Sequence, residues 1–236
     1  MRVLATIGFS FSAGVFLAAL LPWNGWQLYA AGGILLLALA WLFAARKQKY
    51  FRRGLLILLP LAVSLAYFAG YDHLVRQPIE DRCGAASDFA ATVCDWPQAT
   101  ERGARVTVEL EGYHRARAVL YGEAELLAAR PGDTVTGTAQ WQSAAHFDSD
   151  DVTHFNARGV YALLYGREDV RLSAGDGDAL RWLPQRAGKA FREKVAAIWD
   201  DPRVSGFLTA ELTGDKSAMD DGDYLAMQET GLAHLF

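Results

Sequence analysis

The first 71 residues contain no acidic side chain, and all 27 acids lie at or beyond Asp72. A membrane-spanning helix needs roughly 20 consecutive, mostly apolar residues. Three such runs fill this stretch, at residues 3–22, 27–45 and 54–71. Three acid-free apolar runs in succession are not typical of buried helices in a water-soluble protein. The sequence therefore predicts a membrane anchor of three transmembrane helices over residues 1–71.

The basic residues of this stretch predict its orientation. Five bases cluster between the second and third runs, at Arg46, Lys47, Lys49, Arg52 and Arg53, and such clusters remain on the cytoplasmic side. Trp23 and Trp26 flank the tight connection between the first two runs, as suits a membrane–water interface. We therefore expect a cytoplasmic N-terminus and an extracytoplasmic segment from residue 72 to about 185. A cleaved signal peptide over residues 1–22 is the alternative, but a second span follows too soon.

Beyond the anchor, residues 79–173 have the pattern of a small all-β domain. Residues 105–111 alternate strictly, so Val106, Val108 and Leu110 would face a core. Turn residues separate this segment from four other β-prone segments, at residues 89–94, 115–121, 134–141 and 159–165. Five short strands in a domain of this size predict an OB-like five-stranded barrel, with a small sandwich as the alternative.

Cys83 and Cys94 are the two cysteines of the chain, and they flank the first expected strand. The extracytoplasmic compartment permits disulfides, so we expect a Cys83–Cys94 bridge, with two free thiols as the alternative. Two cysteines without neighbouring histidines are too few for a metal site.

Residues 184–236 form a helical region. Residues 185–199 carry an apolar stripe at helical spacing, so this helix either lies on a membrane surface or packs on another helix. Pro202 and Gly214 mark the two ends of a second helix, and Asp220 or Asp221 is a candidate cap for a short one reaching Thr230.

No catalytic constellation, nucleotide-binding loop or cofactor motif occurs in the sequence, so we expect a binding protein rather than an enzyme. The loop around residues 146–154 groups two histidines with three aspartates, and we interpret it as a solvated acidic loop without metal. These residues are His146, Asp148, Asp150, Asp151 and His154.

OB-folds bind single strands through basic grooves and stacking aromatic side chains. The matching side chains of the β-domain are the candidate DNA-binding residues, with Arg105, Arg115 and Arg117 expected on one outward patch. Residues 79–173 hold nine arginines, no lysine and 15 acids, so the domain as a whole repels DNA, and pairing of the arginines with glutamates is the alternative. The candidates are Arg102, Arg105, Tyr113, Arg115, Arg117, Tyr121, Trp141 and Arg158.

Several segments resemble the N-terminal part of the ComEC/Rec2 family of DNA-uptake channel proteins. They are residues 116–122, 130–135 and 155–161 in the β-domain, and residues 212–216 followed by 231–235. The arrangement of leading spans and an external β-domain resembles the family as well. Family members continue into a multi-helix channel domain, so we expect residues 184–236 to be its truncated beginning.

The resemblance implies a location and a function. The chain would be the N-terminal region of a bacterial inner-membrane channel for single-stranded DNA in natural transformation, with the OB-like domain contacting the incoming strand. Its implied partners are single-stranded DNA, membrane lipid and other competence proteins, with no cofactor. The alternative is a structural or partner-docking module of the same channel that does not bind DNA.

Overall fold

In the computed structural model, the chain forms two compact units. One unit comprises residues 1–87, 110–118 and 140–163, and the other comprises residues 88–109, 119–139 and 164–236. The described residues are 3–20, 26–44, 51–147, 150–151, 155, 158–167, 169–213, 219, 222–223 and 225–226.

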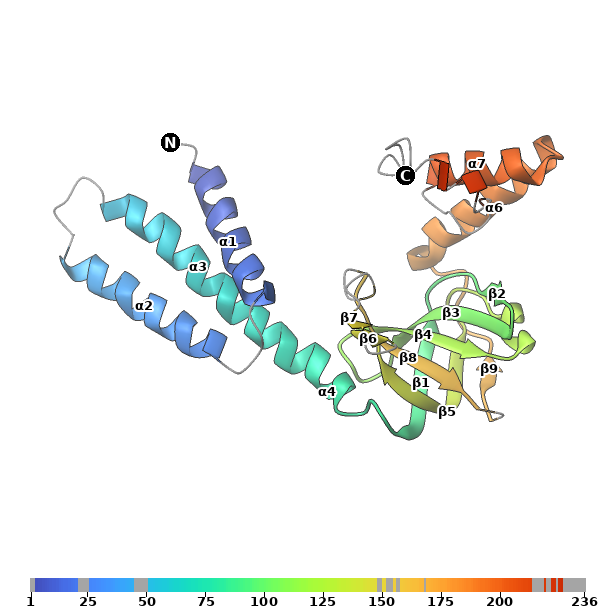
Figure 1. The fold of residues 1–236 in the computed structure, drawn as a ribbon, viewed down its shortest axis with the longest axis horizontal. Coiled ribbons are helices and arrows are strands. Elements are labelled where there is room, and N and C mark those ends of the chain that lie inside the picture. The colour runs from blue at the N-terminus through green and yellow to red at the C-terminus, as the bar shows by residue number, and fades with distance from the viewer. Residues whose placement is uncertain are drawn as a thin grey trace. The chain divides into compact units, whose positions relative to one another are not determined.

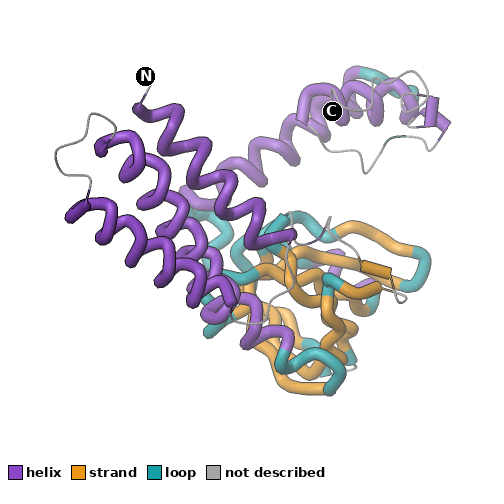
Figure 2. Tube along the Cα trace, turned by 60° about the vertical axis from the view of Figure 1, so that its left-hand side comes forward, coloured by secondary structure: helices purple, strands orange, loops and turns teal. Residues whose placement is uncertain are grey.

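Three helices occupy the predicted positions of the anchor: α1 (Val3–Leu20), α2 (Trp26–Ala44) and α3 (Phe51–Tyr71). The third packs against both of the others (Figures 1 and 2). Among the described residues, two helices are long and apolar enough to cross a membrane, Val3–Leu20 with a mean hydropathy of 2.0 and Gly54–Glu80 with 1.9. The described apolar stretch of α2, Leu28–Leu42, is shorter.

Small residues allow α1 to approach α3 closely. Ser10, Gly14 and Ala18 lie four residues apart and are the buried positions of α1. A Cβ atom at Gly14 would overlap Ser64 of α3, whose hydroxyl donates to the Leu61 carbonyl at 2.8 Å. Such small-residue contacts are typical of helix packing in membranes.

The helical path does not stop at the end of α3. A π-helical turn, η1 (Asp72–Arg76), and a short helix, α4 (Gln77–Glu80), follow directly. Pro78 lies in the first turn of α4, where its missing N–H is tolerated. The first acids and bases after the anchor therefore sit on an extension of the last apolar helix.

The β-domain is a closed barrel, so the barrel prediction is confirmed and the sandwich alternative is wrong. The order is β1-β3-β4-β8-β5, and pairing of β1 with β5 closes it (Figure 1). The five strands are β1 (Ala86–Val93), β3 (Gly103–Leu110), β4 (Arg117–Gly122), β5 (Thr134–Ser143) and β8 (Val160–Gly166).

Smaller strands lie beside the barrel strands. The short strand β2 (Gln98–Thr100) pairs with β3, and β9 (Arg171–Ser173) pairs with β5. A separate ribbon joins β6 (His146–Phe147) to β7 (Asp150–Asp151).

The strict alternation of β3 is confirmed. Val106, Val108 and Leu110 are at most 2% exposed, whereas Arg105 of the same strand is exposed. A strand alternates its side chains between two faces, and the apolar face lines the interior.

The helical region contains a 3₁₀ turn, η3 (Leu180–Trp182), followed by α6 (Leu183–Ile198) and α7 (Pro202–Thr213). Another 3₁₀ turn, η2 (Ala124–Ala128), joins β4 to β5. Both predicted long helices are therefore present, although the α6 stripe is only partly buried: Val195 is 4% exposed and Ile198 is 61% exposed. The predicted helix to Thr230 and the run 231–236 fall largely or wholly outside the described residues.

The expected disulfide is absent, since Cys83 and Cys94 are both free thiols. The Cys83 Sγ faces the Ile79 carbonyl at 3.4 Å, and the Cys94 Sγ faces the Thr92 carbonyl at 3.5 Å. The reason is the eight-residue strand β1 between the cysteines. An extended strand rises about 3.3 Å per residue, whereas a disulfide requires Cα atoms within about 7 Å.

Candidate functional site

The candidate arginines are exposed but are not gathered in one patch. Arg105 lies near the start of β3 and Arg117 is the first residue of β4. Because consecutive strands of a hairpin run in opposite directions, these two arginines stand at opposite ends of the strand pair. The Arg105 guanidinium donates two hydrogen bonds to Gln98 Oε1, at 2.8 and 3.0 Å.

The predicted strand position of Arg115 is wrong. His114 and Arg115 have φ angles of 47° and 64°, so they form the tight turn before β4. A left-handed backbone interrupts strand alternation, and for that reason Arg115 does not share a strand face with Arg117. Arg102 and Arg158 also lie in turns and are exposed.

Trp141, a predicted stacking residue, is a core residue instead, with 1% of its surface exposed. Its indole Nε1 donates to the Ser87 carbonyl at 3.3 Å. The Tyr113 ring lies 6.1 Å away, and the Arg82 guanidinium lies 5.5 Å from Tyr113 and 5.8 Å from Trp141. The three side chains pack against one another within their own unit, so Trp141 is not exposed for a base to stack on.

Tyr121 is the predicted aromatic with a surface position. Its ring stacks on Tyr165 of β8 at a centroid distance of 5.2 Å and an interplanar angle of 13°. Tyr165 is 36% exposed. Sequence reasoning missed Tyr165 because β8 is buried at five successive positions and therefore does not alternate.

A cavity of about 580 Å³ lies beside α6, within the second unit. The indole Nε1 of Trp96 donates to the Gln185 carbonyl at 3.0 Å, and the Lys189 ammonium lies 3.8 Å from the Trp96 ring centroid. A cation above the face of an aromatic ring is attracted to it electrostatically, and this contact helps to hold Lys189 beside Trp96. The lining residues are Trp96, Pro97, Leu127, Ala128, Ala129, Arg130, Lys189, Arg192 and Glu193.

Three of the four charged residues that line this cavity are cations. They are Arg130, Lys189 and Arg192. The fourth charged residue, Glu193, pairs with Lys189 at 3.8 Å. The turn that presents Arg130 is held by Asp133, whose carboxylate accepts the Arg130 N–H at 2.8 Å and the Gly175 N–H at 3.1 Å. Of these residues, the sequence analysis singled out none as a binding residue, because they come from distant parts of the chain.

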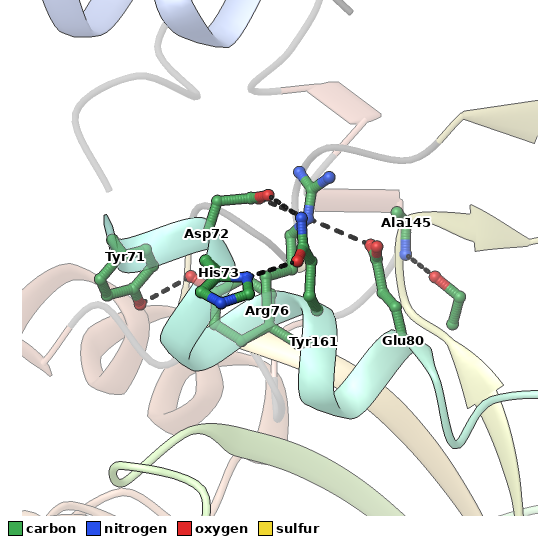
Figure 3. Close-up of polar contacts among 9 residues, drawn as sticks. Tyr71, Asp72, His73, Arg76, Glu80, Ala145 and Tyr161 are labelled. Atoms are coloured by element: carbon green, nitrogen blue, oxygen red, sulfur yellow. Dashed lines mark hydrogen bonds and ion pairs between the residues drawn. The ribbon is translucent and has the colours of Figure 1, made fainter. Parts of the chain in front are cut away.

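A polar network ties the end of α3 to β8 (Figure 3). The Tyr71 and Tyr161 hydroxyls lie 2.8 Å apart. Arg76 Nε lies 2.9 Å from the buried Asp72 carboxylate and 3.2 Å from Glu80. Burial, followed by the hydrogen bond with Tyr71, raises the pKa of Tyr161. This phenol therefore stays neutral and acts as a fixed hydrogen-bonding partner.

The acidic loop forms the β6–β7 ribbon, in which His146 pairs with Asp151 and Phe147 pairs with Asp150. Asp148 and His154 lie outside the described residues. Within the part of the chain that the structure describes, no three His, Cys, Asp or Glu side chains are grouped to hold a metal ion.

No family model, curated protein or solved structure matches this chain. The function of the chain must therefore be inferred from its apolar helices, its barrel and the groups that they position.

Proposed function

We propose that this chain is the N-terminal region of an inner-membrane channel that takes up single-stranded DNA, with its barrel meeting the strand outside the cytoplasm. The observation that carries the proposal is a closed five-stranded barrel that follows a helix apolar enough to span a membrane. The resemblance of the sequence to the ComEC/Rec2 family points in the same direction.

The strand order supports an OB-like barrel. The last two barrel strands in sequence, β5 and β8, are exchanged in space, since β8 lies between β4 and β5. This exchange gives a Greek-key arrangement, which is the arrangement of the five-stranded OB-fold. OB-folds bind oligonucleotides on the face of their second and third strands, which here are β3 and β4.

The outward side chains of these strands fit such contacts. Arg105 and Arg117 are exposed cations on β3 and β4. Tyr121 presents an aromatic surface that is already stacked on Tyr165. Cations track a phosphate backbone and aromatic rings accept bases without sequence preference, so the proposal assigns binding rather than catalysis.

The test is single-stranded DNA binding by the full chain in nanodiscs of neutral lipid, followed by fluorescence anisotropy across a salt series. We expect affinity to fall with salt, and Arg105→Ala/Arg117→Ala to reduce the slope of log K against log salt by about 1.4, because each single-strand phosphate contact contributes about 0.7. Absence of binding at low salt would overturn the proposal.

A partner-docking module is the second candidate function, and the charge of the β-domain favours it. Residues 79–173 carry 15 acids against nine arginines, which disfavours nonspecific binding of a polyanion. Capture of a basic protein partner by the full chain, in the absence of any DNA binding, would select this alternative.

A further inference from the structure

We infer that the cavity beside α6 binds the phosphate backbone of a single nucleic-acid strand, with Trp96 as its aromatic wall. Three segments build it: the connection from β1 to β3, the end of η2 with its connection to β5, and α6. The inference rests on the proposed function and adds a binding site away from the β3–β4 face.

Charge is the first argument. The β-domain is acidic as a whole, but the cavity is lined by three cations, Arg130, Lys189 and Arg192, and one anion, Glu193. Two of these cations come from α6, beyond the acidic β-domain. A local positive concavity attracts phosphates even where the net charge opposes binding, because nearby charges are screened least.

The second argument is that the cavity is pre-organised. Trp96 is fixed by its hydrogen bond to the Gln185 carbonyl at 3.0 Å, and Lys189 is held 3.8 Å from the Trp96 ring. Asp133 fixes the turn that carries Arg130. Groups that are ordered before the ligand arrives lose less conformational freedom on binding.

Size and position give the third argument. A volume of about 580 Å³ lies in the range of sites that hold small organic groups, roughly 300–1,000 Å³. Trp96 and Pro97 belong to the connection between the first two barrel strands, the loop that helps to bind oligonucleotides in OB-folds. Trp96 is only half-buried, and Lys189 lies over one face of its ring, so the remaining exposed ring surface is what a base would contact.

The first test compares two triple variants of the full chain in neutral nanodiscs, by anisotropy with a labelled thymidine 20-mer. We expect Arg130→Gln/Lys189→Gln/Arg192→Gln to lower the slope of log K against log salt by about 2, because three phosphate contacts are lost. The control Arg167→Gln/Arg171→Gln/Lys194→Gln makes the same charge change outside the cavity, and its slope should stay unchanged.

The second test probes the cavity with a small nucleotide in place of the thymidine 20-mer. The full chain is labelled with 5-fluorotryptophan, and the ¹⁹F resonance of residue 96 is identified by its loss in Trp96→Phe. We expect thymidine 3′,5′-bisphosphate at millimolar concentration to shift this resonance, and thymidine without phosphates to leave it unmoved. The cavity triple variant should lose the shift while it keeps the other tryptophan resonances, which shows that the variant is folded.

The outcomes separate the site from the function. Strand binding with equal salt slopes in both triple variants would overturn the inference and leave the proposed function standing. Failure of the full chain to bind any strand would overturn the proposed function and the inference together. A residue-96 resonance that moves in nanodiscs containing anionic lipid, and not with the bisphosphate, would overturn the inference and assign the cavity to a lipid headgroup.

Discussion

At the scale of single residues, Asp72 stabilises the helical extension of α3, since its partners Arg76 and Gln77 lie in η1 and α4. Its carboxylate is 3% exposed and contacts Arg76 Nε at 2.9 Å, and it also accepts a hydrogen bond from Gln77 at 3.3 Å. Asp72→Asn keeps the size of the side chain but removes the charge that Arg76 pairs with. Arg76 would then keep only Glu80 as an ion-pair partner, and removal of one member of a largely buried pair destabilises the fold, so we expect the unfolding free energy to fall by about 1–2 kcal/mol.

The measurement is a urea titration of the full chain in detergent, followed by circular dichroism. Asp178→Asn is the matched control, because the Asp178 side chain is 99% exposed although it pairs with Arg186 at 3.1 Å. Exposed ion pairs contribute little, so this control should change the unfolding free energy by less than about 0.5 kcal/mol. Equal losses in the two variants would show that the Asp72 contacts do not stabilise the helical extension of α3.

The two cysteines give a prediction about reactivity. Burial, together with the charge of Glu80, raises the pKa of the Cys83 thiol to about 11. The thiolate is the reactive form and its fraction rises tenfold per pH unit below the pKa, so at pH 8 Cys83 should alkylate about 100-fold more slowly than an ordinary thiol. Its alkylation rate should keep rising as the pH increases toward 11.

Mass spectrometry after alkylation in urea checks the state of both cysteines. We expect two alkylated thiols without any reductant, and the same mass after reduction. A chain that gains two alkyl groups only after reduction would contain a Cys83–Cys94 disulfide. That result would contradict the structure, in which β1 keeps the two cysteines apart.

At the scale of elements, the close approach of α1 and α3 depends on Gly14. A larger side chain there would overlap Ser64 and contact Leu61. Overpacking of this kind costs about 1–3 kcal/mol, so Gly14→Leu should separate the two helices and reduce the resistance of the anchor to SDS. Gly8→Leu is the control on the same helix, because a Cβ at Gly8 meets nothing within 4 Å.

The readout is the loss of helical circular dichroism as the SDS fraction in mixed micelles is raised. Gly14→Leu should unfold at a lower SDS fraction than the parent chain. The control Gly8→Leu should unfold at the same SDS fraction as the parent chain. If both variants behave like the parent chain, the contact of Gly14 with Ser64 does not hold α1 against α3.

Local patterns in the sequence predict elements well, because each pattern is the direct consequence of one helix or strand. The alternation of β3 is such a pattern. The same pattern in β5 predicts a buried Trp141, since Val135, Ala139 and Trp141 are buried along one face of that strand. The cavity beside α6 could not be predicted, because Trp96 and Lys189 meet only after tertiary packing. The positive φ of Arg115 is likewise set by the geometry of its hairpin, which alternation alone does not encode.

At the scale of the whole molecule, the chain combines an apolar, acid-free beginning with an acidic remainder, and this asymmetry predicts its orientation. Of its 23 bases, five lie between residues 46 and 53, and bases of this kind remain in the cytoplasm. Of the two described helices long and apolar enough to cross a membrane, Val3–Leu20 lies before that segment, with α2 between them, and Gly54–Glu80 follows it directly. With three spans, the barrel should therefore be extracytoplasmic.

Cysteine labelling in intact spheroplasts tests this orientation. In a background with Cys83→Ser and Cys94→Ser, we expect a membrane-impermeant maleimide to label Glu111→Cys, which lies in the exposed turn after β3. Lys49→Cys, in the basic segment, should be labelled only after the membrane is permeabilised. The reverse pattern would mean either an even number of spans or an inverted anchor with an extracytoplasmic N-terminus. In both cases an extracytoplasmic strand could not reach the barrel or the cavity beside α6.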